Sequence, residues 1–188
     1  MDPNALLERT LDQAERVIAN VKPDQLDNGT PCAEWKVRDV LNHIIGGNHF
    51  FAAAASGQPL PTGDGTDLVG DDPASAYAQG AKAALEAWQQ PGVAERTITL
   101  PIGDLPGSFA QGIHFIDHLV HTWDLAKATG QDVGGLDAEL AEAGYSMMKG
   151  NVPEQFRTGE NAPFGPEVPC AEGAPAIDRL AAYLGRTP

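Results

Sequence analysis

The chain has 188 residues, which is enough for one domain with its own hydrophobic core, and its hydrophobic fraction of 42% is ordinary for a globular protein. Acidic side chains outnumber Lys and Arg by 26 to 12, which gives a formal net charge of −14 and an isoelectric point near 4.5. A surface this acidic disfavours nucleic acids and anionic membranes as partners. We therefore expect a single domain over residues 1–188 that binds neither.

Three further features predict a cytoplasmic protein. The sequence opens with Met1-Asp2-Pro3-Asn4, which lacks the basic region of a secretory signal. The cysteines, Cys32 and Cys170, lie far apart and do not indicate a disulfide framework. The most apolar run, residues 44–55, is too short and too polar to span a bilayer.

The first third of the chain predicts two helices. Asp2-Pro3 is typical of a helix start, with an acid at the N-cap and proline in the first turn, and Lys22-Pro23 ends this helix. The second helix runs from about Trp35 to about Ser56, where apolar residues recur at helical spacing. Gly47 follows His43 by one turn, and it leaves room there for either a ligand or a closely packed helix.

The middle of the chain predicts a third helix and a short hairpin. Residues 57–71, rich in Pro, Gly and Asp, predict a surface loop, after which Asp72-Pro73 starts a helix that Pro91-Gly92 ends. The run from Arg96 to Leu100 alternates in polarity and is typical of a strand. A turn at Gly103-Asp104 would bring the chain back beside it.

Three more helices are expected in the last half. One is capped by Ser108 and ended by Gly130, one runs from Asp137 to about Lys149, and one starts at Pro175. Residues 151–174 between the last two predict an irregular segment. Amphipathic helices without an alternating strand–helix pattern predict an all-α helical bundle.

The helix after Ser108 carries a polar stripe that suggests a metal site. His114, Asp117, His121 and Asp124 are spaced to share one helix face beside an apolar stripe. Two ligands at i and i+4 with a third from another helix commonly hold a divalent ion. Asp117 and His121 would be the pair and His43 the third ligand, which leaves open positions for water or a substrate.

The spacing alone leaves alternatives. His114 and His118 are also four residues apart, so the pattern does not choose between the two pairs. A single histidine on a helix is more often a satisfied or exposed side chain than a ligand, and His49 and His118 are assigned to that class. Asp124 is most simply a carboxylate that orients a ligand, or a helix-end charge without function.

Other candidate groups have plain structural explanations. Cys32 shows no activating neighbour in the sequence and is interpreted as a small buried side chain. The tryptophans, Trp35, Trp88 and Trp123, are expected in the core.

Two motifs resemble a known family. The segment Thr30-Pro-Cys-Ala-Glu-Trp-Lys-Val-Arg-Asp-Val-Leu-Asn-His43 and the segment Asp117-His-Leu-Val-His-Thr-Trp-Asp124 are similar to the paired motifs of the DinB-like superfamily. The nearer resemblance is to the branch that contains mycothiol-dependent maleylpyruvate isomerase and many short metal-binding relatives. The ending Leu184-Gly-Arg-Thr-Pro188 is also similar to those short relatives.

The resemblance implies a four-helix bundle in up-down-down-up order, here with extra C-terminal helices and a short β-hairpin, and a divalent metal, zinc or nickel, between helices. It assigns His43, Asp117 and His121 as the ligands, which breaks the tie left by spacing. Asp117 stands where the wider superfamily has His and the isomerase has Glu. The sequence also ends without the extra C-terminal domain of the isomerase, so its activity on maleylpyruvate is not carried over.

Three functions compete. The first is a metal-dependent transferase or isomerase that uses a low-molecular-weight thiol such as mycothiol on a small electrophile, with Asp124 or His114 as candidates for orienting a ligand or moving a proton. The second is a non-catalytic metal-containing protein that binds a small ligand or serves a stress response. The third is a metal-free bundle whose stripe is a buried polar network. A small-molecule substrate and a thiol are the expected partners, and a homodimer is included among the expected assemblies.

Overall fold

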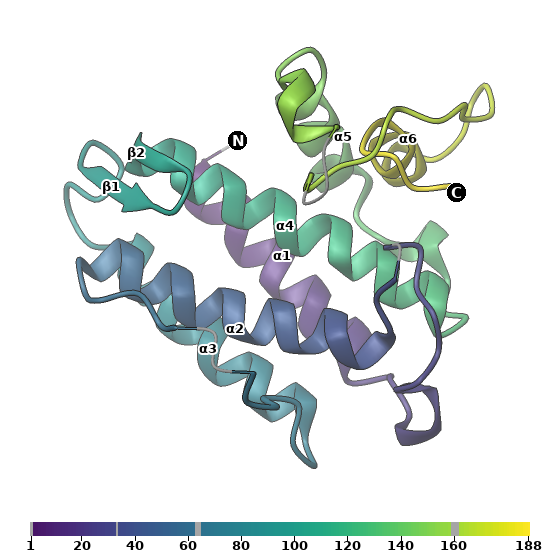
Figure 1. The fold of residues 1–188 in the computed structure, drawn as a ribbon, viewed down its shortest axis with the longest axis horizontal. Coiled ribbons are helices and arrows are strands. Elements are labelled where there is room, and N and C mark those ends of the chain that lie inside the picture. Colours follow the sequence, from purple (N-terminus) through teal and green to yellow (C-terminus); the bar gives the residue numbers. More distant parts are fainter. Residues whose placement is uncertain (1, 33, 63–64, 159–161) are drawn as a thin grey trace.

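The computed structural model describes residues 2–32, 34–62, 65–158 and 162–188. Over these residues the chain forms six α-helices, three short 3-10 helices and one antiparallel pair of strands (Figure 1). The α-helices are α1 (Pro3–Ile18), α2 (Val37–Ser56), α3 (Pro73–Trp88), α4 (Gly107–Ala128), α5 (Ala138–Met148) and α6 (Ala176–Tyr183), and the strands are β1 (Thr97–Leu100) and β2 (Gly103–Pro106).

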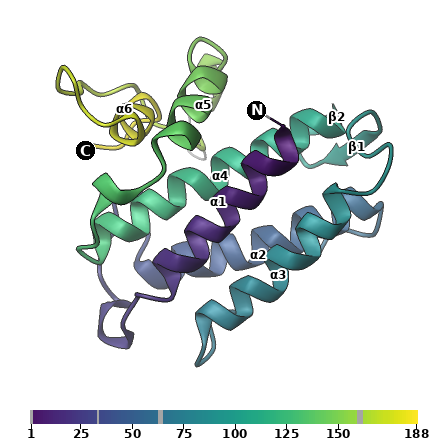
Figure 2. The same ribbon diagram turned by 180° about the vertical axis from the view of Figure 1, so that it is seen from behind.

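The first four helices form a bundle, as the sequence predicts. α1 packs along α4, α2 packs along α3, and α2 also contacts α4 (Figure 1, Figure 2). The predicted caps of α1, α3 and α5 are confirmed, because Asp2, Asp72 and Asp137 each accept a hydrogen bond from a backbone N–H of the first turn. The largest fully buried side chains of the bundle include Leu7, Leu11, Leu41, Ile44, Tyr77, Leu119 and Trp123.

Three predicted helix starts are wrong by one or two residues. The last helix, α6, begins at Ala176, and Pro175 is its N-cap. α2 begins at Val37 rather than near Trp35, because Trp35 lies in a loop that a bridge between Gly29 and Lys36 closes. α4 begins at Gly107, so Ser108 lies inside its first turn instead of capping it. A Cβ on Gly107 would lie only 1.8 Å from the carbonyl oxygen of Val93, so the chain can pass this point only with glycine.

The predicted hairpin is present, but its turn lies earlier than expected. Leu100 pairs directly with Gly103, which leaves Pro101 and Ile102 as the two turn residues. Gly103 and Asp104, predicted as the turn, are the first residues of β2. Gly103 has a φ of 120°, which explains why glycine is suited to the position where the second strand begins.

The two predicted irregular segments contain no α-helix or strand among their described residues, but the first is anchored to the bundle at its end. In the first, the Val69 side chain is fully buried and the backbone N–H of Leu68 donates to the Asn42 side chain on α2. The second contains a 3-10 helix at Glu154–Phe156. The end of the loop at residues 57–71 therefore packs against the bundle.

The C-terminal helices form a small unit outside the four-helix bundle. α5 and α6 pack against each other, and both contact α4 (Figure 1). The segment from Gly165 to Val168 runs beside the end of the chain, where the N–H of Gly165 donates to Leu184 and that of Val168 donates to Ala182. This unit directs the last residues back toward α4. None of the described helices has the length and apolar character needed to cross a bilayer.

Candidate metal centre

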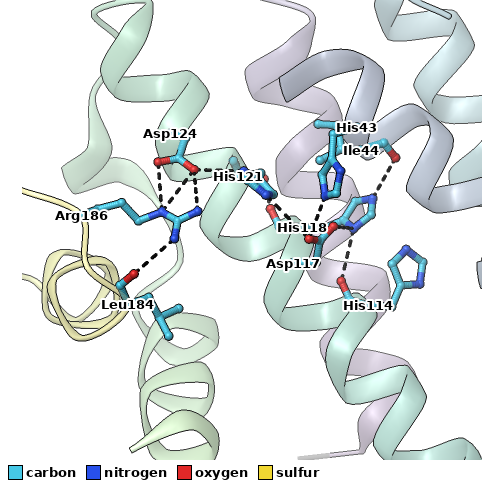
Figure 3. Close-up of polar contacts among 10 residues, drawn as sticks. His43, Ile44, His114, Asp117, His118, His121, Asp124, Leu184 and Arg186 are labelled. Atoms are coloured by element: carbon cyan, nitrogen blue, oxygen red, sulfur yellow. Dashed lines mark hydrogen bonds and ion pairs between the residues drawn. The ribbon is translucent and has the colours of Figure 1, made fainter. Parts of the chain in front are cut away.

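The structure brings together the three predicted ligands. His43 comes from α2, and Asp117 and His121 lie one turn apart on α4 (Figure 3). Asp117 Oδ1 lies 3.0 Å from His43 Nε2 and 3.7 Å from His121 Nε2. One ligand atom of each residue falls within 4.8 Å of the other two, which is close enough for the three to share a metal ion.

The same three residues are coupled electrostatically. Burial opposes the charged form of Asp117, but His43 and the neighbouring imidazoles outweigh it and lower the pKa of this carboxyl far below its usual range. Burial also opposes the charged form of His43, whose pKa is nevertheless raised because Asp117 lies beside it. Asp117 is thus ionised at neutral pH and His43 lies in a field that attracts a cation.

His121 is oriented by a chain of polar contacts behind it. Its Nδ1 lies 3.0 Å from Asp124 Oδ2, and because a carboxylate only accepts hydrogen bonds, Nδ1 carries the proton. The lone pair of the ring is then on Nε2, the atom that faces Asp117. Asp124, predicted as an orienting carboxylate, therefore contacts His121 in the way that histidine ligands of metals are usually held.

The alternative histidine pair lies deeper in the bundle. His114, also named for proton transfer, is fully buried: Trp88 Nε1 donates to its Nδ1 at 3.1 Å, and its Nε2 donates to Asn48 Oδ1 at 3.0 Å. His118 is also fully buried, with its ring nitrogens 3.1 Å from the carbonyl oxygen of Ile44 and 3.2 Å from that of His114. The protein thus occupies both nitrogens of each ring, and the structure does not place His114 with the three predicted ligands.

Three residues near the centre were not identified from the sequence. Trp35, expected in the core, is only half-buried and stacks on His121 at 5.5 Å between ring centroids, with His43 at 4.9 Å. Cys32 Sγ lies within 4.8 Å of ligand atoms of His121 and Asp124, and burial raises the pKa of its thiol. Arg186, from the end of the chain, contacts Asp124.

Sequence carries little signal for these three residues. Trp35 and Cys32 belong to the motif before His43, but the sequence does not show that their loop folds over α4. Arg186 follows the last helix and is separated from Asp124 by 62 positions. The expectation that Trp88 and Trp123 are core residues is confirmed, since they are 4% and 0% exposed.

The donor set fits a divalent transition metal. Two imidazoles and one carboxylate suit Zn²⁺ and Ni²⁺, and three protein ligands leave further coordination positions open. Trp35 lies against the rings of His43 and His121 and closes one side of the cluster. His43, with 39% of its side chain exposed, marks the side that solvent reaches.

Comparisons with known proteins agree with this architecture. The family model described as "Mycothiol maleylpyruvate isomerase N-terminal domain" matches residues 7–126, a range that contains His43, Asp117, His121 and Asp124 but not Arg186. Two uncharacterised proteins of Mycobacterium tuberculosis, Rv0738 of strain ATCC 25618 / H37Rv and MT0763 of strain CDC 1551 / Oshkosh, are each 39% identical over 187 residues. The alignments cover 100% of this chain and 99% of each relative.

One solved structure shares the fold. The crystal structure of the mycothiol-dependent maleylpyruvate isomerase aligns with a TM-score of 0.58 and 13% identity, over 74% of this chain and 65% of that chain. The expected DinB-like bundle is thereby confirmed as the architecture. The chain spans about two thirds of the length of that isomerase, and at this identity the likeness concerns the fold alone.

Proposed function

The chain belongs to the mycothiol maleylpyruvate isomerase N-terminal domain family, and from this membership and the site geometry we propose that it binds a divalent metal and uses a low-molecular-weight thiol of the mycothiol type on a small electrophile. The observation that carries the proposal is the convergence of His43, Asp117 and His121, with ligand atoms within 4.8 Å of one another. Zinc is the first candidate and nickel the second.

The chain's own residues have distinct tasks in this proposal. His43, Asp117 and His121 would hold the ion, and a divalent ion, when bound, supplies a Lewis acid that lowers the pKa of a coordinated thiol. Asp124 keeps the Nε2 lone pair of His121 available by accepting from Nδ1. Trp35 covers the imidazoles from one side and limits water there, so a thiol and its electrophile would approach from the side on which His43 is exposed.

A non-catalytic role is the second candidate, and one observation favours it. The two groups named for proton transfer are both engaged by the protein: Asp124 by His121 and Arg186, and His114 by Trp88 and Asn48. A site that binds a metal and a thiol without a free proton carrier suits sequestration or sensing of a small ligand better than turnover.

Metal analysis and thiol titration test the proposal in that order. The protein, purified without chelator, should contain about one equivalent of zinc or nickel, and a His121→Ala variant should contain none. His49→Ala is a matched control, since His49 is an exposed histidine on the same helix as His43. Absence of stoichiometric metal from the unmodified protein, also after incubation with Zn²⁺ or Ni²⁺, would reject the metal site.

Calorimetry then addresses the thiol. Mycothiol titrated into the zinc-loaded protein should bind with measurable heat, and the metal-free protein should bind it more weakly. No heat at millimolar thiol would remove the thiol from the proposal. A panel of small electrophiles separates the two candidate functions. Only the enzymatic function predicts that an electrophile is converted to product, whereas the non-catalytic role predicts binding without turnover.

A further inference from the structure

The carboxylate behind His121 is itself held by the end of the chain. Asp124 is fully buried, and Arg186, only 7% exposed, donates to it from Nε at 3.3 and 3.4 Å and from Nη2 at 3.2 Å (Figure 3). A buried carboxylate without a cationic partner is costly, so the guanidinium offsets much of the cost of placing Asp124 inside the protein.

The position of Arg186 is fixed by the C-terminal unit. Its backbone N–H donates to Ala181 at 2.9 Å, and its Nη1 donates to the carbonyl of Leu184 at 3.4 Å. Gly185, with a φ of 90°, turns the chain immediately before it, and a Cβ there would lie 2.4 Å from the Cα of Gly165. Close contact between two glycine backbones thus brings the tail back onto α4.

These contacts form a continuous chain from the tail to the proposed metal ligand. The guanidinium holds both oxygens of Asp124, Asp124 Oδ2 accepts from His121 Nδ1, and His121 Nε2 faces Asp117. An aspartate fixed in this way can only accept, so it selects one tautomer of His121. Residue 186 lies outside the range 7–126 that the family model matches.

We propose that Arg186 is a positioning residue that acts through Asp124 to hold His121 in its metal-binding tautomer, so that the C-terminal unit completes the candidate metal centre. This inference deepens the proposed function and rests on it for the metal, but the tautomer of His121 can be measured without metal. The test therefore has two readouts on the full chain.

The variants are Arg186→Gln, Arg186→Lys and Arg179→Gln. Arg179→Gln is the matched control, because Arg179 also belongs to the C-terminal unit but pairs with Glu142, a half-exposed side chain away from the centre. Circular dichroism and thermal unfolding establish that each variant is folded. The tautomer is read from ring ¹⁵N shifts of histidine-labelled metal-free protein, and metal affinity is read from titration with Co²⁺.

The unmodified protein and Arg179→Gln should show His121 with the proton on Nδ1. Arg186→Gln should lose this single tautomer and bind Co²⁺ about 10–100-fold more weakly, the range seen when partners behind metal ligands are removed. Arg186→Lys should recover part of both properties, because it restores the charge without the two-pronged hydrogen bonding. A folded Arg186→Gln variant with the tautomer and Co²⁺ affinity of the unmodified protein overturns the proposal.

The test still decides the role of Arg186 if a variant fails to fold or if the protein does not bind Co²⁺. If Arg186→Gln does not fold, the pair Asp124→Asn with Arg186→Gln replaces it, since it leaves no unpaired buried charge. The pair is compared with Asp124→Asn alone: because Arg186 acts through Asp124, adding Arg186→Gln should change neither the tautomer mixture nor the Co²⁺ affinity further, and a further loss would count against the inference. If the unmodified protein does not bind Co²⁺, the proposed metal function fails, whereas the tautomer comparison still decides the role of Arg186.

Discussion

Two groups of histidines meet at α4 and have opposite surroundings. The outer group, His43 and His121 with Asp117, has ring nitrogens that converge on one another and on a carboxylate. In the inner group, His114 and His118, protein atoms occupy all four ring nitrogens. Each group includes two α4 residues four positions apart, Asp117 with His121 and His114 with His118, so spacing does not distinguish a candidate ligand from a core residue. What distinguishes them is whether the fold already uses the nitrogens.

Removing a proposed ligand from the outer group gives the largest expected effect. His121→Ala should weaken Zn²⁺ binding at least about a thousandfold, which exceeds the loss expected from a residue behind the ligands. The fold should persist, since the apolar core of the bundle does not depend on this side chain. Competition with a chromophoric chelator measures the affinity, and circular dichroism measures the fold. Zn²⁺ binding that survives His121→Ala would place the site elsewhere.

The two groups should also respond to pH in opposite directions in the metal-free protein. Burial lowers the pKa of His118 to about 4, so its contribution to stability is present above its unfolded pKa of about 6.5 and is lost as the pH falls toward 4. Full loss over that window corresponds to about 3 kcal/mol. The pKa of His43 is raised by Asp117, so its contribution is present below pH about 6.5 and is lost as the pH rises through the folded-state value.

Urea unfolding across this pH range measures both slopes. His118→Gln should flatten the loss of stability between about pH 6.5 and pH 4, and His43→Gln should flatten the loss above about pH 6.5. The His49→Gln variant serves as a control, because it changes an exposed histidine. If His118→Gln keeps the full acid dependence, the inner ring is not held neutral by burial.

Substituting His114 should affect stability but not metal binding. His114→Leu leaves the Trp88 N–H and the Asn48 carbonyl oxygen without their partner in the core, which should cost about 2–3 kcal/mol of unfolding free energy. Urea unfolding of the metal-free protein measures the loss, and Zn²⁺ affinity should stay unchanged in the folded variant. A large drop in affinity with little loss of stability would move His114 into the outer group.

The smallest expected effect concerns the glycine between the two groups. A Cβ on Gly47 would lie 3.4 Å from His118 Cε1 and 3.8 Å from Asp117 Oδ2, which are ordinary contact distances. Gly47→Ala should therefore stabilise α2 by up to about 1 kcal/mol and leave Zn²⁺ affinity unchanged. Gly80→Ala is the contrasting variant, because its Cβ would lie 2.9 Å from Asn48 Cβ, and thermal unfolding should show destabilisation. Loss of metal binding in Gly47→Ala would show that this space is needed by the ligand.

The sequence predicted the fold well because its signals are local. The acids before Pro3, Pro73 and Ala138 marked helix starts that the structure confirms, and the apolar spacing of the long helices indicated a bundle. The errors occurred where distant contacts set the boundary. Gly107 starts α4 because it packs against Val93, and no pattern around Ser108 reveals that contact.

The candidate site was predictable only in its first layer. His43, Asp117 and His121 stand in motifs with helical spacing, and the structure brings them together, while their role as metal ligands stays a prediction. Spacing alone could not choose between this set and the pair of His114 and His118, because both have the same periodicity. Burial decides how the two pairs differ, and burial depends on how α2 packs over α4 and on the α3 side chains Tyr77 and Trp88 that reach the inner histidines.

The contact of Trp35 with His121 and His43 gives the chain its own optical reporter. An indole within 5.5 Å of two imidazoles that would bind an ion should change its emission when that ion arrives, whereas Trp88 and Trp123 lie buried and contribute a constant background. Metal binding at the centre can therefore be followed by tryptophan fluorescence in unlabelled protein. A Trp35→Phe variant should remove this metal-dependent change in emission while leaving every proposed ligand in place.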